Sequence, residues 1–229
     1  MAGPVAHEAI DKDSLFFALA EDLKTPLLRI AYQAELAAES AIRVTAVDTL
    51  KLLDAYLLGA KSQAQFELEP VNPSAVLADV AHGLAEHAKR FDCELQLSVP
   101  SHHLTALLHR QALISALTAI GSVFIESQAV MGGKRIIEMA SYRTSRGVAV
   151  GIFQTAGATT INAQLFSRAR SHVGTASRPF AGFASGAAAQ LFVAEQLLVG
   201  MRSSLRATHR GARSGLAADL LASSQLRLV

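Results

Sequence analysis

The sequence predicts an α+β protein in which a helical hairpin precedes an α/β sandwich. Three observations predict this fold class: two consecutive segments carry apolar residues at helical spacing, a segment with two prolines then interrupts that pattern, and the remaining chain mixes apolar helices with alternating strands. Of the 229 residues, 51% are hydrophobic and only 17% are charged, so the chain can bury a substantial core.

The first helix is expected from about residue 15, after Asp13 and Ser14, which suit a helix cap. At about 100° per residue, one side of this helix collects an apolar stripe. The stripe consists of Leu19, Leu23, Pro26, Leu27, Ile30, Ala34 and Ala37. Glu21 is predicted to point the opposite way.

The second helix is expected over residues 42–65, where apolar residues again recur at intervals of three and four. Only a few residues separate the two helices, so they should fold back as an antiparallel hairpin. Because a lone hairpin cannot bury both apolar stripes, we expect a homodimer in which two hairpins form a four-helix bundle. The predicted domains are residues 1–66 and 67–229.

The second domain begins after "FELEPVNPSAV", whose prolines end the helical pattern. The pattern that follows predicts a helix from Asn72 to about Arg90, a strand in "CELQLSVP", a helix over 109–127, a β-hairpin over 132–157, a helix from Ser185 to Val199, and short strands near 203–208 and 216–221. This order predicts helices on one face of a mixed sheet.

The stretch "EDLKTPLLRI" resembles the phosphoacceptor motif of sensor histidine kinases, usually His-Glu-Leu-Arg-Thr-Pro-Leu. Residues 22–27 match that motif or substitute it conservatively. The order of elements downstream is similar to that family's GHKL-type ATPase domain, and the resemblance covers nearly the whole chain. It implies a dimerisation hairpin followed by an α/β sandwich of the histidine-kinase ATPase type.

The chain departs from the family at the phosphoacceptor position, which holds Glu21 where the family has histidine. A carboxylate lacks the imidazole nitrogen that forms a phosphoramidate, so no catalytic residue is predicted, and Glu21 with Asp22, Thr25 and Pro26 marks only the former site. Pro26 has no N–H for the carbonyl of Asp22, so a bend is expected there. Glu21 is either a solvated glutamate, or a charged mimic or partner contact.

The nucleotide signatures of the family are also missing. The Mg²⁺-holding asparagine is absent from 109–127, because the chain contains only Asn72 and Asn162. The adenine-recognising aspartate is absent too, because no Asp lies between Asp92 and Asp219. Of the glycine-rich boxes, "GIFQTAG" keeps Gly157 and "GAAAQL" keeps Gly186. A phosphate cradle needs such glycines for close backbone approach, so ordinary ATP binding and a cofactor are not expected.

One face of the first helix, opposite the predicted stripe, is apolar where solvent would be expected. It comprises Phe17, Glu21, Thr25, Leu28 and Tyr32, which we call the partner patch. The resemblance implies that a response-regulator receiver domain docks on this part of the bundle, and three apolar side chains around an acidic centre suit protein binding. The alternative is that this face packs against the chain's own second domain.

Several function classes are disfavoured. Cys93 is the only cysteine, which excludes an internal disulfide and favours a reducing cytoplasm, and neither a signal peptide nor a membrane span is expected. No metal site is predicted, since His82 and His87 are poorly spaced on a helix. The basic second half has scattered arginines without interleaved aromatics, so a nucleic-acid partner is not expected.

These observations predict a non-catalytic, histidine-kinase-like two-component signalling protein that dimerises and binds a response-regulator receiver domain or a partner kinase. The alternative is a divergent histidine kinase or histidine phosphotransferase that transfers phosphoryl groups to a response regulator. That alternative needs an exposed histidine on the bundle, and residues 8–81 contain none.

Overall fold

The computed structural model describes residues 12–61, 66–100, 105–127, 135–145, 147–155, 171 and 186–223. The chain divides into two compact units, Met1–Ala60 and Lys61–Val229. None of the helices in the described ranges combines the length and the apolar run needed to cross a bilayer.

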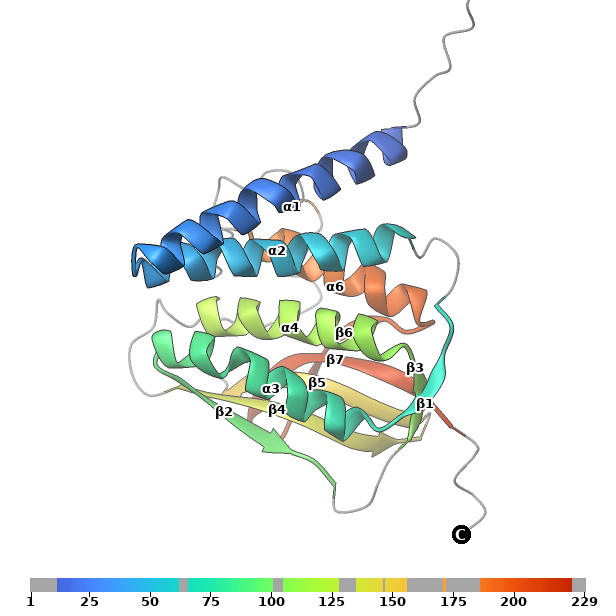
Figure 1. The fold of residues 1–229 in the computed structure, drawn as a ribbon. Helices are drawn as coiled ribbons and strands as arrows, with labels where there is room; N and C mark the ends of the chain where they lie inside the picture. Colours follow the sequence, from blue (N-terminus) through green and yellow to red (C-terminus); the bar gives the residue numbers. More distant parts are fainter. Residues whose placement is uncertain are drawn as a thin grey trace, which may run out of the picture. The chain divides into compact units, whose positions relative to one another are not determined.

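The first unit is the expected antiparallel helical hairpin, formed by α1 (Lys12–Leu36) and α2 (Ser40–Lys61) (Figure 1). Helix α1 continues through Pro26 without ending there. The turn between the helices places Ala38 in the left-handed region, with φ 57°, and the amide of Glu39 donates to the carbonyl of Ala34 at 2.8 Å. The short link therefore closes the hairpin as its length predicts.

Part of the predicted apolar stripe of α1 is buried in the single chain. Its members Leu27 and Ala34 are half-buried and buried, whereas Leu19, Leu23 and Ile30 are 49%, 52% and 44% exposed. The other buried or half-buried side chains of α1 include Ala20, Lys24 and Ala31. Small alanine side chains let two helices approach closely, whereas the longer side chains of the stripe remain on a second face, roughly a quarter-turn away.

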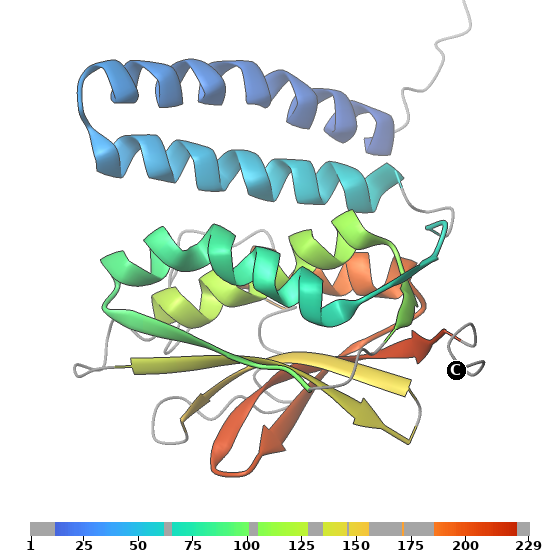
Figure 2. The same cartoon turned by 60° about the horizontal axis from the view of Figure 1, so that its bottom comes forward.

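The second unit is an α/β sandwich whose helices cover one face of a mixed sheet, as the sequence predicts (Figure 2). Its helices are α3 (Pro73–Arg90), α4 (Arg110–Ser127) and α6 (Ala187–Gly200). Its strands are β1 (Glu69–Val71), β2 (Cys93–Ser98), β3 (Ala106–Leu108), β4 (Arg135–Thr144), β5 (Gly147–Thr155), β6 (Leu205–Arg210) and β7 (Arg213–Ala222). The three-residue strands β1 and β3 were not expected.

The strand order is β1-β3-β7-β5-β4-β2, with β6 also paired to β7. Among the described strand pairs, only β2 and β4 run parallel, and the other pairs are antiparallel. Helix α3 begins where the sequence predicts, because the side chain of Asn72 accepts a hydrogen bond from the amide of Ser74 at 2.9 Å. The predicted cap at Ser185 lies outside the described residues.

The main core lies between the helices and the sheet. Helix α4 is the most enclosed helix, and its Leu113, Ile120 and Phe124 are at most 2% exposed. An added Cβ at Gly121 of α4 would lie 3.6 Å from Ile152 of β5, which shows that Ile152 projects toward the helical layer. The side chain of Phe153 therefore projects from the opposite face of the sheet.

That opposite face carries a smaller packed cluster. Phe153 is fully buried there with Ala140 and Ala217, and Tyr142 packs against it. Beside the cluster, the Glu138 carboxylate accepts hydrogen bonds from Arg210 at 2.8 Å and from Arg213 at 2.5 Å. Both faces of the sheet are thus stabilised by packed side chains.

A Glu138→Ala variant is expected to lose about 2 kcal/mol of the free energy of unfolding. Glu138 is buried, and its removal leaves two guanidinium groups without their carboxylate. The loss stays below that of a deeply buried pair because Arg210 and Arg213 are 36% and 28% exposed. Urea denaturation measures this loss, and Glu86→Ala on the exposed face of α3 is the control, expected to change stability by under about 0.5 kcal/mol.

Candidate functional site

Glu21, at the position that holds histidine in the resembled motif, lies on α1 beside Lys24. Lys24 also forms an ion pair with Asp54 of α2. The Nζ atom of Lys24 is 3.6 Å from Glu21 Oε2 and 2.8 Å from Asp54 Oδ1 of α2. The hydrogen bond with Asp54, with a smaller contribution from Glu21, raises the pKa of Lys24 above its usual value. Glu21 is 41% exposed and is therefore a partly solvated carboxylate beside a cation.

Lys24 connects Glu21 with the second helix. It lies one turn further along α1 than Glu21 and reaches across to Asp54 of α2. A carboxylate held beside an ammonium group presents fixed charge but has no nitrogen nucleophile. Residue 21 therefore offers a charge for electrostatic contacts and no nitrogen that could form a phosphoramidate.

The partner patch lies entirely within the continuous helix α1, so its members share one face. Leu28 and Tyr32 are 57% and 62% exposed, Thr25 is exposed, and Phe17 is half-buried. Asp22 and Pro26 are also exposed. The exposed apolar row continues beyond the predicted patch to Leu36, which is 71% exposed.

Sequence reasoning missed the roles of Lys24 and Asp54. Lys24 could have been noticed, because it lies three residues after Glu21 and this spacing brings helical side chains together. Asp54 could not, because its place beside Lys24 depends on the register between α1 and α2. No local pattern in the chain encodes that register.

In the second unit, the elements that would frame a nucleotide are present in outline. Helix α4, the end of β5 and the start of α6 correspond to the three nucleotide signatures considered above. Gly186 is the N-cap of α6, with φ 92° and no side-chain cap hydrogen bond. An added Cβ at Gly186 would meet nothing within 4 Å, so the backbone conformation, rather than close packing, favours glycine there. Gly157 lies outside the described residues.

The acidic side chains near these elements already face nitrogen-bearing partners. Glu126, near the end of α4, lies 3.3 Å from His87 of α3, and Glu138 of the neighbouring strand β4 is held by its two arginines. Gln154, near the end of β5, is buried and uncharged. Among the described residues, no group of three or more His, Cys, Asp or Glu side chains could hold a metal ion.

No protein-family profile and no curated protein matches the chain. Solved structures do match it. Full-length ShkA in complex with AMPPNP is 17% identical with a TM-score of 0.63, over 93% of this chain and 46% of ShkA. The chain thus spans about half the length of ShkA.

Two further structures resemble the chain. The histidine kinase AdeS of Acinetobacter baumannii is 13% identical with a TM-score of 0.51, over 86% of this chain and 94% of AdeS. The catalytic domain of the histidine kinase ThkA, in a nucleotide-free form, is 12% identical with a TM-score of 0.50, over 68% of this chain and 96% of that domain.

The ShkA match covers 93% of this chain, so it must include most of the hairpin. The ThkA match covers only 68% of this chain. At these identities, the comparisons establish the fold. The chain has the fold of a histidine kinase catalytic core with its ATPase-type domain, and this confirms the resemblance inferred from the sequence.

Proposed function

We propose that this chain is a non-catalytic, histidine-kinase-like protein of cytoplasmic two-component signalling, which dimerises through its hairpin and regulates a receiver domain or a partner kinase by binding it. One observation carries the proposal: the fold is retained while the phosphoacceptor, the Mg²⁺-holding asparagine and the adenine-recognising aspartate are all replaced. A scaffold without reacting groups can still bind and position a partner.

The test of catalysis uses Glu21→His. The wild-type chain has no histidine at residue 21 to accept phosphate, so it would stay unlabelled even if its second domain bound and used ATP. Wild type, Glu21→His and Glu21→Gln are each mixed with radiolabelled ATP and Mg²⁺. We expect no acid-labile phosphate on any of the three, since restoring the imidazole does not restore the residues that hold the nucleotide. Labelling of Glu21→His would show a working ATPase-type domain and overturn the non-catalytic proposal in favour of a divergent kinase.

Dimerisation is supported by apolar surface on the hairpin. A groove of about 350 Å³ lies between α1 and α2, lined by Leu27, Ile30, Ala41, Ile42, Thr45, Ala46 and Thr49. The hydroxyls of Thr45 and Thr49 donate to the carbonyls of Ala41 and Thr45 at 3.0 and 2.7 Å, so these polar groups are already satisfied. The groove can therefore accept apolar side chains from a second hairpin without leaving those hydroxyls unpaired.

Partner binding is supported by the surface of α1 around Glu21. Leu28 and Tyr32 expose large apolar side chains on the same face as a carboxylate at the former reaction site. Surface patches that combine exposed aromatic or aliphatic groups with a charged centre are typical of transient protein interfaces. The same face is the one that the family resemblance assigns to receiver docking.

A Leu28→Asp/Tyr32→Asp double variant is expected to bind its receiver domain at least about tenfold more weakly, because central apolar contacts dominate such interfaces. Binding is measured by titration calorimetry against purified receiver domains encoded in the same genome. Gln33→Ala, an exposed change elsewhere on α1, is the control and should leave affinity unchanged. Equal affinity of the double variant and wild type would contradict the assignment of this face.

A further inference from the structure

The strand β2 ends the main path of the sheet at one side. It pairs with β4, and in the described part of the chain no second strand pairs with it. Natural edge strands are commonly protected by lysine, proline or a bulge. Residues 93–98 contain neither lysine nor proline, and their register with β4 is unbroken. Among the strands that the structure describes, none lies on the side of β2 that faces away from β4.

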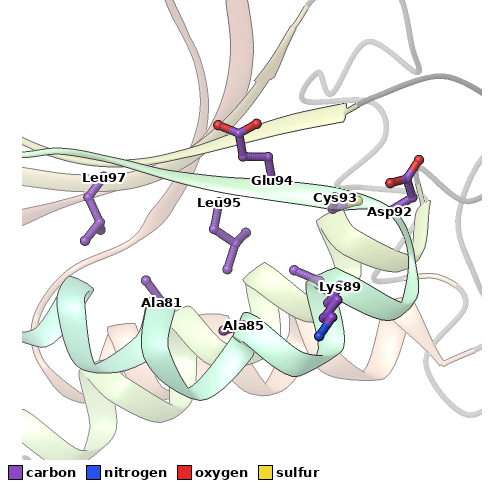
Figure 3. A pocket seen from close by; sticks show the side chains of 9 residues that line it. Ala81, Ala85, Lys89, Asp92, Cys93, Glu94, Leu95 and Leu97 are labelled. Atoms are coloured by element: carbon purple, nitrogen blue, oxygen red, sulfur yellow. The ribbon is translucent and has the colours of Figure 1, made fainter.

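A groove of about 530 Å³ lies beside this edge, between β2 and α3 (Figure 3). Leu95 and Leu97 of β2 project into it, whereas Glu94 points away from it. The helix contributes small side chains, among them Ala81 and Ala85, which leave the space unfilled. The volume falls within the range of about 300–1,000 Å³ that is usual for binding pockets.

The apolar surface of the groove extends to the end of the strand. Leu97, near the end of β2, is 47% exposed, and Val99, directly after the strand, is 45% exposed. A sheet edge without a second strand among the described residues, exposed aliphatic side chains and an alanine-lined groove thus occur together. A ligand with an extended backbone and apolar side chains at alternate positions satisfies all three features, because alternate side chains of a strand point to one face.

We propose that the edge of β2 and the groove beneath α3 form a docking site for an extended segment of a partner protein, which adds to the sheet as a further strand. Apolar side chains at every second position of that segment enter the groove, and its backbone pairs with β2. The residues of this interface belong neither to the hairpin nor to the nucleotide-like region, so the proposal does not rest on the function proposed above.

The negative charge of Asp92 indicates that the docking segment of the partner also carries a basic residue. Asp92 is exposed at the start of β2, and among the described residues it has no ion-pair partner. The side chain of Lys89, which also lines the groove, points away from Asp92 in Figure 3. A lysine or arginine at one end of the segment would complement Asp92. A second copy of β2 would not, because residues 92–99 contain no basic side chain.

The experiment uses random dodecapeptides displayed on phage. Phage that bind an Ala85→Phe variant, in which the larger side chain fills the groove, are first removed. The remaining phage are then selected on the immobilised full wild-type chain. Selected peptides are synthesised and titrated by calorimetry. Ala78→Phe is the matched control, because Ala78 is also an exposed alanine of α3 but does not line the groove. Circular dichroism and thermal unfolding verify that both variants are folded.

We expect peptides with apolar residues at alternate positions and a basic residue at one end, bound at least about tenfold more weakly by Ala85→Phe and equally well by Ala78→Phe. N-methylation along the peptide should weaken binding about fivefold at every second residue only, since alternate amides face β2.

Three outcomes would overturn the proposal. The first is the absence of any peptide that prefers wild type to Ala85→Phe. The second is an N-methylation profile without a two-residue period. The third is self-association of the chain that Leu97→Lys abolishes, because a second copy would then be the occupant in place of a partner segment.

Discussion

A Gly215→Ala variant is expected to lose about 3 kcal/mol of the free energy of unfolding, a large share of the usual stability of a domain. Gly215 lies in β7 opposite Phe153 of β5. An added Cβ would lie 2.1 Å from the carbonyl oxygen of Ile152 and 2.7 Å from the Cα of Phe153. Both atoms belong to the backbone of the adjacent strand, so no side-chain rotation can relieve the clash.

The matched control is Gly83→Ala in α3, where an added Cβ meets nothing within 4 Å. Alanine is the better helix former, so this variant is expected to gain about 0.5–1 kcal/mol. Urea denaturation followed by circular dichroism measures both variants. If Gly215→Ala were as stable as wild type, the close approach of β5 and β7 at this point would be wrong.

A Leu23→Glu variant is expected to convert the proposed homodimer into a monomer. Leu23 is 52% exposed in the single chain, on the face that also carries Leu19 and Ile30. In a symmetric bundle, the substitution places two carboxylates in one apolar interface. The resulting desolvation and like-charge repulsion should weaken dimerisation at least about a hundredfold.

Sedimentation equilibrium of the full chain over a range of concentrations measures this change. Leu36→Glu is the control, because Leu36 is 71% exposed but lies about a third of a turn or more from the Leu23 face. We expect the control to remain dimeric. A dimer that survives Leu23→Glu would refute the interface, and a wild-type chain that remains monomeric at high micromolar concentration would refute the dimer itself.

The hairpin shows where helical periodicity is sufficient and where it is not. Apolar spacing predicted both helices, but it did not specify which of the apolar residues of α1 are buried within the hairpin of a single chain. Each helix of a four-helix bundle needs two apolar faces, and periodicity does not say which face meets the neighbouring helix of the same chain. The alanine face, with Ala20 and Ala34, is buried, and the leucine face around Leu23 is left exposed.

The sandwich domain shows a similar division. Strands of six residues or more, such as β2 and β7, were expected from alternation or apolar character, whereas β1 and β3 have only three residues each. Such short strands carry too few positions to establish a two-residue period. They exist because they pair with each other, and β3 also with β7.

The sequence alone determined the types of the longer elements, the histidine-kinase-like order and the presence of Glu21 where the resembled motif has histidine, because each depends on local spacing or on residues that can be counted. Only the tertiary structure decided that Lys24 meets Asp54, that Phe153 is buried on the second face of the sheet, and that β2 borders a groove. These features depend on contacts between segments distant in the chain, whose register no local pattern specifies.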